Sequence, residues 1–377
     1  MRIAIITFHR AYNCGAMLQA WALKSCLQTM GHEVFFPDCN TVGQDKEWYV
    51  LNIPKDKKGI SFVRSLVGRC FLDIKSRLRR NPYKKYYRLF LSEFLGEVNC
   101  SKEEISKFFD IAIFGSDQIW NPDITAKDTD LFQGEVLPKS FPRIAYAASS
   151  GEKEFALEEF NRLSRNISLF KHVSVREVAL QQLLSVSKSK DVPIVADPVL
   201  LLDAKDFNLF LRDPIINEPY VYLYTVNGRD DELSLARRVA KKMNLRLVVS
   251  PVKLGARYFM PPEADPILSP SRMVNYIAKA QCVIAFSYHG MALATIFNKP
   301  FVAGSLLHGK TESRLVSLAR ILGLQNRVIE SSSPIDCVAE LLETALPDSV
   351  RTNLKEFSQR SQSWLENAIR SVSENKG

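Results

Sequence analysis

The sequence lacks the features that mark disulfide-stapled, zinc-binding and membrane-spanning proteins. Its seven cysteines are scattered, their number is odd, and no two of them form a C-x-x-C pair. This pattern argues against a disulfide framework and against a zinc site. No window contains the roughly eighteen unbroken apolar residues that a membrane-spanning helix needs. We therefore expect a protein without a bound metal and without a transmembrane segment.

We expect no signal peptide at the beginning of the chain. The strand-like run Ile3–Thr7 follows Arg2 directly, whereas a signal peptide needs a longer apolar stretch and a small-residue cleavage site. Apolar residues make up 46% of the chain and charged residues 24%, which is ordinary for a globular protein. We expect a cytoplasmic protein, and its 377 residues suit two or three domains.

Positive charge is concentrated in one segment, residues 55–88. This segment holds twelve lysines and arginines against two aspartates, a net charge of +10, while the whole chain carries +9. Apolar residues fall on one side of a predicted helix, so the segment either packs on its host domain or lies on anionic lipid at the inner face of the membrane. No recognised nucleic-acid-binding motif accompanies the charge, so nucleic acid is not an expected partner.

Strand and helix signals alternate along most of the chain. The predicted strands form two series: Ile3–Thr7, Glu33–Phe36, Ile111–Phe114, Ile144–Ala148, Val173–Val175 and Ile194–Ala196, then Val221–Val226, Leu245–Ser250, Cys282–Phe286 and Phe301–Ala303. Helical runs lie between most of them; the first is predicted over Met17–Met30, and a last helix is predicted at about Leu354–Ile369. This βαβ rhythm predicts parallel sheets covered by helices on both faces.

The fold class that follows is α/β, with two Rossmann-like parallel-sheet domains that face a cleft. A break near Asp197 and Pro198 separates the two series. The expected units are an N-terminal domain over 1–200, a basic helical insertion within it at about 40–100, a C-terminal domain over 205–345 and a C-terminal helix over 348–377. Small-molecule sites favour domain interfaces and the carboxyl ends of parallel strands, so we expect the site there.

Polar residues cluster where the predicted strands end. They are Asn13, Gly15, Asp117, Ser149, Arg176, Ser287, His289, Gly290 and, beyond the last of these strands, Lys310. Strand ends need such residues for turns anyway, so the signal lies in their coincidence at one edge.

His289 is the strongest catalytic candidate. It follows an apolar strand and, with Gly290, opens a helix. Amides at a helix N-terminus attract anions, and an imidazole there can donate a proton to a bound phosphate or enol ether. The alternative is a histidine that caps the helix or packs.

Three cations and one carboxylate complete the candidates. Arg176 either forms an ion pair at the surface or holds a carboxylate or phosphate with its planar guanidinium. Lys310 and Arg314 are four residues apart, so one helical turn presents both to an anion, unless they form a solvated helix start. Asp117 either forms a turn, or accepts a hydrogen bond from a sugar hydroxyl or deprotonates it.

Seven sequence stretches follow one another along residues 3–325. They read IITFHRAYNCGAMLQAWAL, FDIAIFGSDQIWNP, RIAYAASSG, VSVRE, VADPVLLL, FSYHGMALATIFNKPFV and KTESRLVSLARILGL. Taken as an ordered set, they resemble the polysaccharide pyruvyl transferase family.

The resemblance implies a fold and an activity. It implies a GT-B-like fold, in which two Rossmann-like domains hold the site between them. Family members transfer an enolpyruvyl-derived group from phosphoenolpyruvate to two hydroxyls of a sugar, forming a cyclic ketal and releasing phosphate. The expected acceptor is a sugar of a bacterial surface polysaccharide or its lipid-linked precursor; phosphoenolpyruvate is a co-substrate, and no cofactor is implied. The alternatives are a GT-B glycosyltransferase that uses a nucleotide sugar, and a non-enzymatic scaffold in polysaccharide assembly.

The resemblance also implies roles for individual residues. The histidine of the family's H-G pair matches His289 and the arginine of its S-x-R-E pattern matches Arg176, so both are expected to act in catalysis and to bind phosphoenolpyruvate. The other candidates divide into donor-binding residues, namely Ser287, Gly290, Lys310 and Arg314, and acceptor-binding residues, namely Asn13, Gly15, Asp117 and Ser149. Phe286 and Tyr288 stand where a polar residue and a phenylalanine are more usual. The resemblance therefore supports the donor site more than the acceptor contacts.

Overall fold

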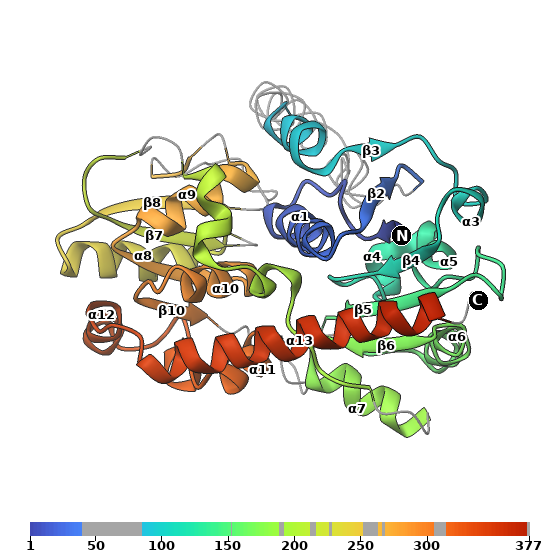
Figure 1. The fold of residues 1–377 in the computed structure, drawn as a ribbon. Helices are drawn as coiled ribbons and strands as arrows, with labels where there is room; N and C mark the ends of the chain where they lie inside the picture. The colour runs from blue at the N-terminus through green and yellow to red at the C-terminus, as the bar shows by residue number, and fades with distance from the viewer. Residues whose placement is uncertain are drawn as a thin grey trace, which may run out of the picture.

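The computed structural model shows two parallel sheets, each flanked by helices (Figure 1). It describes residues 1–39, 85–151, 153–187, 192–211, 216–225, 228–251, 263–265, 268–304 and 314–374. Of the basic segment 55–88 only 85–88 belong to these ranges, and Lys310 lies outside them.

The first sheet has six strands in the order β3-β2-β1-β4-β5-β6, and all its pairings are parallel. The strands are β1 (Arg2–Ile6), β2 (Glu33–Pro37), β3 (Glu97–Val98), β4 (Ile111–Phe114), β5 (Arg143–Ala148) and β6 (His172–Val175). Every residue of β4 and β5 is buried, as expected for parallel strands that are covered on both faces. The strand order reverses between β1 and β4, and the carboxyl edge at such a point is where α/β sheets bind ligands.

The second sheet has five strands in the order β11-β10-β9-β7-β8, again all parallel. The strands are β7 (Tyr220–Thr225), β8 (Arg246–Pro251), β9 (Cys282–Phe286), β10 (Phe301–Gly304) and β11 (Val328–Ile329). Its order reverses between β7 and β9, so the turn after β9, which carries Ser287 and His289, lies at the equivalent edge.

Two helices begin at these reversal points. Asn13 caps α1 (Cys14–Thr29), because its side-chain oxygen accepts hydrogen bonds from the amides of Gly15 and Ala16. Ser287 caps α10 (Tyr288–Ile296) by accepting from the amide of Gly290. The other α-helices are α3 (Ile105–Phe108), α4 (Pro122–Thr125), α5 (Thr129–Phe132), α6 (Leu157–Ile167), α7 (Val178–Ser187), α8 (Asp230–Lys242), α9 (Pro270–Lys279), α11 (Arg314–Leu322), α12 (Ile335–Glu343) and α13 (Asp348–Glu374).

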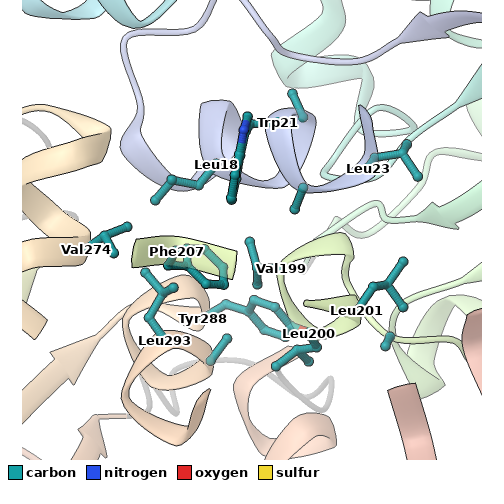
Figure 2. Packing of buried hydrophobic residues seen from close by; sticks show 14 of the residues in the cluster. Leu18, Trp21, Leu23, Val199, Leu200, Leu201, Phe207, Val274, Tyr288 and Leu293 are labelled. Atoms are coloured by element: carbon teal, nitrogen blue, oxygen red, sulfur yellow. The ribbon is translucent and has the colours of Figure 1, made fainter. Parts of the chain in front are cut away.

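A shared hydrophobic cluster joins the two domains (Figure 2). Leu18 and Trp21 of α1 face Val274 of α9 and Leu293 of α10 across the interface. The Trp21 ring meets Phe207 edge-on, with 5.3 Å between ring centroids. This apolar contact positions the first turn of α1 opposite the first turn of α10.

The C-terminal helix α13 crosses from the second domain back to the first (Figure 1). Near its start, Asn353 donates a hydrogen bond to the carbonyl of Leu322 in the second domain. Further on, Ser361 accepts from the amide of Ala196, and Lys171 of the first domain donates to the carbonyl of Ser371. The helix therefore ties both domains, and it is longer than the predicted Leu354–Ile369.

The predicted fold class is confirmed, with differences at the weakest signals. Strands β3 and β11 were not predicted, since two-residue edge strands carry no readable periodicity. The predicted strand Ile194–Ala196 is reduced to a single bridge between Ile194 and Val175, because the chain turns into the connection between the domains there. Within the described ranges, every helix is too short or too polar to cross a membrane. The domain boundaries near 200 and 345 stay predictions.

Candidate functional site

Buried charged side chains gather where the carboxyl ends of the two sheets meet. Asp117 follows β4 and Arg176 follows β6, both in the first domain. His289 belongs to α10 of the second domain, and Asp197 lies on the connection between the domains. All four are buried. The sequence-predicted residues Asp117, Arg176 and His289 are thus brought to one place.

Arg176 is the centre of this cluster. Its Nη1 donates to Oδ2 of Asp197 at 2.5 Å, and its Nη2 lies 3.4 Å from Oδ1 of Asp117. Burial opposes the charge on each group, but the ion pairs outweigh it: the two carboxylates raise the pKa of Arg176, and His289 and Arg176 hold the pKa of Asp197 well below its usual range. Both groups are therefore ionised in the fold.

The surface alternative for Arg176 is wrong. Its side chain is 0% exposed and pairs with buried carboxylates, whereas a surface ion pair would be solvated. Arg176 is an ion-pair residue of the interior, and its role towards a ligand stays a prediction.

His289 lies between the two domains. Its Nε2 is 3.6 Å from Oδ2 of Asp197, too far for a hydrogen bond but close enough for an ion pair when the ring is protonated. Its other ring nitrogen, Nδ1, faces Gly15 at the start of α1, where an ideal Cβ on residue 15 would come within 2.1 Å. Only glycine leaves room for the ring at this point.

This contact predicts the effect of Gly15→Ala. We expect the added methyl group to displace the His289 ring, so Gly15→Ala should lower activity, and it should lower stability only while His289 is present. In the Gly15→Ala/His289→Ala double variant the space is free, so the added methyl group should cost little stability. Thermal and denaturant unfolding of the two single variants and the double variant should give a coupling free energy of about 1–3 kcal/mol. Additive effects would contradict the contact.

Two further residues of the second domain complete the charge arrangement. The ring of Tyr288 faces Arg176, with 4.7 Å from Cζ to the ring centroid, and burial raises the pKa of its hydroxyl. Arg314, at the start of α11, brings Nη1 to 4.0 Å from Oδ1 of Asp117 and stays partly exposed. Tyr288 departs from the family pattern, but it contacts Arg176, which matches the arginine of that pattern.

Glu177 is a second buried carboxyl group next to Arg176. Its Oε1 accepts a hydrogen bond from the amide of Ser150 at 2.9 Å. Burial raises the pKa of Glu177, although Arg176 and Arg314 act in the opposite direction. The site therefore combines a firmly ionised carboxylate, Asp197, with Glu177, a carboxyl group that retains its proton more readily than an exposed glutamate does.

The other predicted residues have local structural roles. The side-chain oxygens of Asn13 and Ser287 cap α1 and α10, and Oγ of Ser149 accepts from the amide of Gly151. Gly290 packs against the ring of Tyr224. Asp117 forms a turn with φ of 75°, a left-handed conformation that aspartate tolerates better than most residues. Their roles towards donor and acceptor stay predictions, as does that of Lys310, which lies outside the described residues.

Asp197 was missed by the sequence reasoning. It follows a predicted strand, as the other candidates do, but its neighbour Pro198 suggested only a domain break. The signal that could have found it was its place at the same carboxyl edge as Arg176.

Two buried side-chain nitrogens at this site have no hydrogen-bond partner in the described ranges. They are Nε of the Arg176 guanidinium and Nε2 of the His289 ring. Buried polar atoms are usually paired, so such atoms indicate a place for a ligand or for closer approach of a neighbour. Among the described residues, no group of three or more His, Cys, Asp or Glu side chains could hold a metal ion.

The arrangement defines a two-domain α/β protein with an ionised, partly cationic site between its sheets. Residues 13–304 match the sequence model of the polysaccharide pyruvyl transferase family. The chain belongs to this family. No curated protein matches the chain at the level of sequence.

Solved structures share the fold over nearly the whole chain. A UDP-N-acetylglucosamine 2-epimerase from Rickettsia bellii aligns with a TM-score of 0.53 and 10% identity, covering 99% of this chain and 97% of that chain. A putative UDP-N-acetylglucosamine 2-epimerase from Listeria monocytogenes aligns with a TM-score of 0.52 and 11% identity, covering 99% and 96%. At such identity the likeness shows the fold alone, and it agrees with the expected GT-B-like pair of domains.

Proposed function

We propose that this transferase forms a pyruvate ketal on a sugar of a bacterial surface polysaccharide or its lipid-linked precursor, with phosphoenolpyruvate as donor. Membership of the family supports the transfer of a pyruvyl group to a polysaccharide. The observation that carries the proposal is the meeting of Arg176, Asp197 and His289 at one buried point between the domains. No further cofactor is proposed.

The site suits a donor that carries a carboxylate and a phosphate. Arg176 and Arg314 supply guanidinium groups, which can hold either anion with parallel hydrogen bonds. The first turns of α1 and α10 lie on either side of the Gly15–His289 contact, and the dipoles of helix N-termini attract negative charge, although the caps already occupy the amides of Gly15, Ala16 and Gly290. Ser287 and Gly290 belong to one of these turns, and Lys310 is proposed to join them.

His289 is proposed as the acid that starts the reaction. Proton transfer to the methylene carbon of phosphoenolpyruvate turns it into a methyl group and leaves an oxocarbenium-like centre at the adjacent carbon. One sugar hydroxyl attacks that carbon and loses its proton. Phosphate leaves with its bridging oxygen, and a second hydroxyl closes the ring; of the two hydroxyl protons, one restores that of the imidazole and the other leaves with the phosphate. Acid catalysis and positioning are the contributions that the protein must supply.

The acceptor is proposed to lie on the first-domain side of the site. Asp117 has a carboxylate that could receive a hydrogen bond from a sugar hydroxyl. Asn13, Gly15 and Ser149 lie at the same carboxyl edge, although the oxygens of Asn13 and Ser149 already accept from backbone amides. These residues would then contact the acceptor through atoms that these hydrogen bonds do not occupy.

Cytoplasmic location at the inner face of the membrane is also a proposal. The support is the net charge of +10 in residues 55–88, which would attract anionic lipid near a lipid-linked acceptor.

Ligand-dependent stabilisation tests the donor. Phosphoenolpyruvate should raise the melting temperature, since a ligand at 100 times its Kd stabilises the folded state by about 2.7 kcal/mol. Nucleotide sugars should leave it unchanged, and the Arg314→Gln variant should respond less to phosphoenolpyruvate than the wild type. Stabilisation by nucleotide sugars alone would favour a glycosyltransferase. A response to neither donor would favour a non-enzymatic scaffold and would overturn the proposal.

A further inference from the structure

Asp197 connects the two domains through a single carboxylate. It begins the turn Pro198–Leu201 on the connection between the sheets, and its Oδ1 accepts from the amide of Val199 at 3.1 Å. This bond fixes the direction of the carboxylate. Its Oδ2 then faces Nη1 of Arg176 at 2.5 Å and Nε2 of His289 at 3.6 Å.

We infer that Asp197 is a positioning residue that keeps a hydrogen on Nε2 of His289, so that Nδ1 is the atom that exchanges a proton with the ligand. A carboxylate beside one ring nitrogen selects the tautomer that has its hydrogen there. Nδ1 is the ring atom nearest to Gly15, so it lies beside the first turn of α1, where the two domains meet. The inference rests on the proposed function only for the identity of the ligand.

Because Asp197 and His289 are both buried, the carboxylate selects this tautomer of the imidazole strongly. The side chain of Asp197 is 0% exposed, so water does not screen its charge, and Arg176 keeps it ionised. An ionised carboxylate accepts hydrogen bonds and cannot donate one, so only a ring with a hydrogen on Nε2 interacts favourably with it. The distance of 3.6 Å would shorten when a ligand fills the site, as catalytic hydrogen bonds often do.

The other groups around Oδ2 do not compete for this role. Oγ of Ser116 lies 3.3 Å from Oδ2 but also donates to the carbonyl of Ala147 at 2.8 Å. Arg176 comes from the first domain and His289 from the second. Asp197 therefore links the orientation of the imidazole to the relative position of the two domains.

The experiment reads the tautomer directly. Long-range proton–nitrogen spectra of the full chain, labelled with ¹⁵N-histidine, show which ring nitrogen carries the hydrogen in the neutral state. The chain has five histidines, and His289→Ala assigns the signal of interest. In the wild type we expect the hydrogen on Nε2. In Asp197→Ala no carboxylate faces Nε2, so we expect the preference for a hydrogen on Nε2 to be lost. Ser116→Ala, which removes the neutral neighbour, should leave the wild-type tautomer.

A hydrogen on Nδ1 in the wild type, or an unchanged preference for Nε2 in Asp197→Ala, would overturn the inference. If Asp197→Ala does not fold, the wild-type spectrum decides by itself. Where the wild type transfers pyruvate, Asp197→Ala should also lower kcat by about 10²–10⁴-fold. A wild type that does not use phosphoenolpyruvate would end the proposed function, while the tautomer would still test the inference about Asp197.

Discussion

Replacing His289 by alanine is expected to abolish pyruvyl transfer while the fold stays intact. A positioned acid contributes about 10²–10⁴-fold to the rate, so the variant should lose at least two orders of magnitude in kcat. The ring caps no helix, and Arg176 still pairs with Asp197 when the ring is gone, so its removal should cost less stability than the loss of Arg176. Phosphate release from phosphoenolpyruvate in the presence of acceptor measures the loss.

A second histidine provides the control. His32 lies just before β2, at the amino ends of the strands and so on the side of the first sheet opposite to the site, and it is partly buried. His32→Ala should therefore keep its activity. Activity of His289→Ala within a few-fold of the wild type would remove His289 from the mechanism.

Replacing Arg176 is expected to affect both stability and donor binding. Arg176→Ala removes the guanidinium that pairs with the fully buried Asp197, and loss of one partner of a buried ion pair costs about 3–5 kcal/mol. The sequence alone favoured a role in donor binding over one in stability, because it did not reveal these partners. Thermal and denaturant unfolding of the variant measure the stability term.

Arg176→Lys separates the two roles. Lysine keeps the charge but loses the planar fork, and a hydrogen bond to a charged group contributes about 1.5–3 kcal/mol. We therefore expect the affinity for phosphoenolpyruvate to fall about ten- to a hundredfold in calorimetric titration.

Arg143 offers a matched control for this variant. It is equally buried, but it donates to the carbonyls of Phe141, Gly134, Leu137 and Pro138, away from the site. Arg143→Lys should lose stability and bind the donor normally. The same behaviour in Arg176→Lys would make Arg176 purely structural.

The sequence was sufficient for much of the fold because parallel strands are buried on both faces. The runs that became β4 and β9 are apolar throughout, and their predicted bounds agree with the structure. Helix starts were less accurate: α1 begins at Cys14 rather than Met17, because the Asn13 cap extends it. Cys14 itself is a packing residue; burial raises its pKa to about 12, and its sulfur lies 2.8 Å from the hydroxyl of Tyr87.

Part of the candidate site could also be predicted from the sequence, and the rest depends on the tertiary structure. The sequence by itself determined that polar residues end the strands, and parallel strands bring their carboxyl ends to one edge, so the place of Asp117, Arg176 and His289 could be predicted. Only the tertiary structure decided that Arg176 is buried, that Gly15 receives the ring of His289, and that Asp197 faces both. These contacts join segments far apart in the chain and depend on how two domains pack, which no local periodicity encodes.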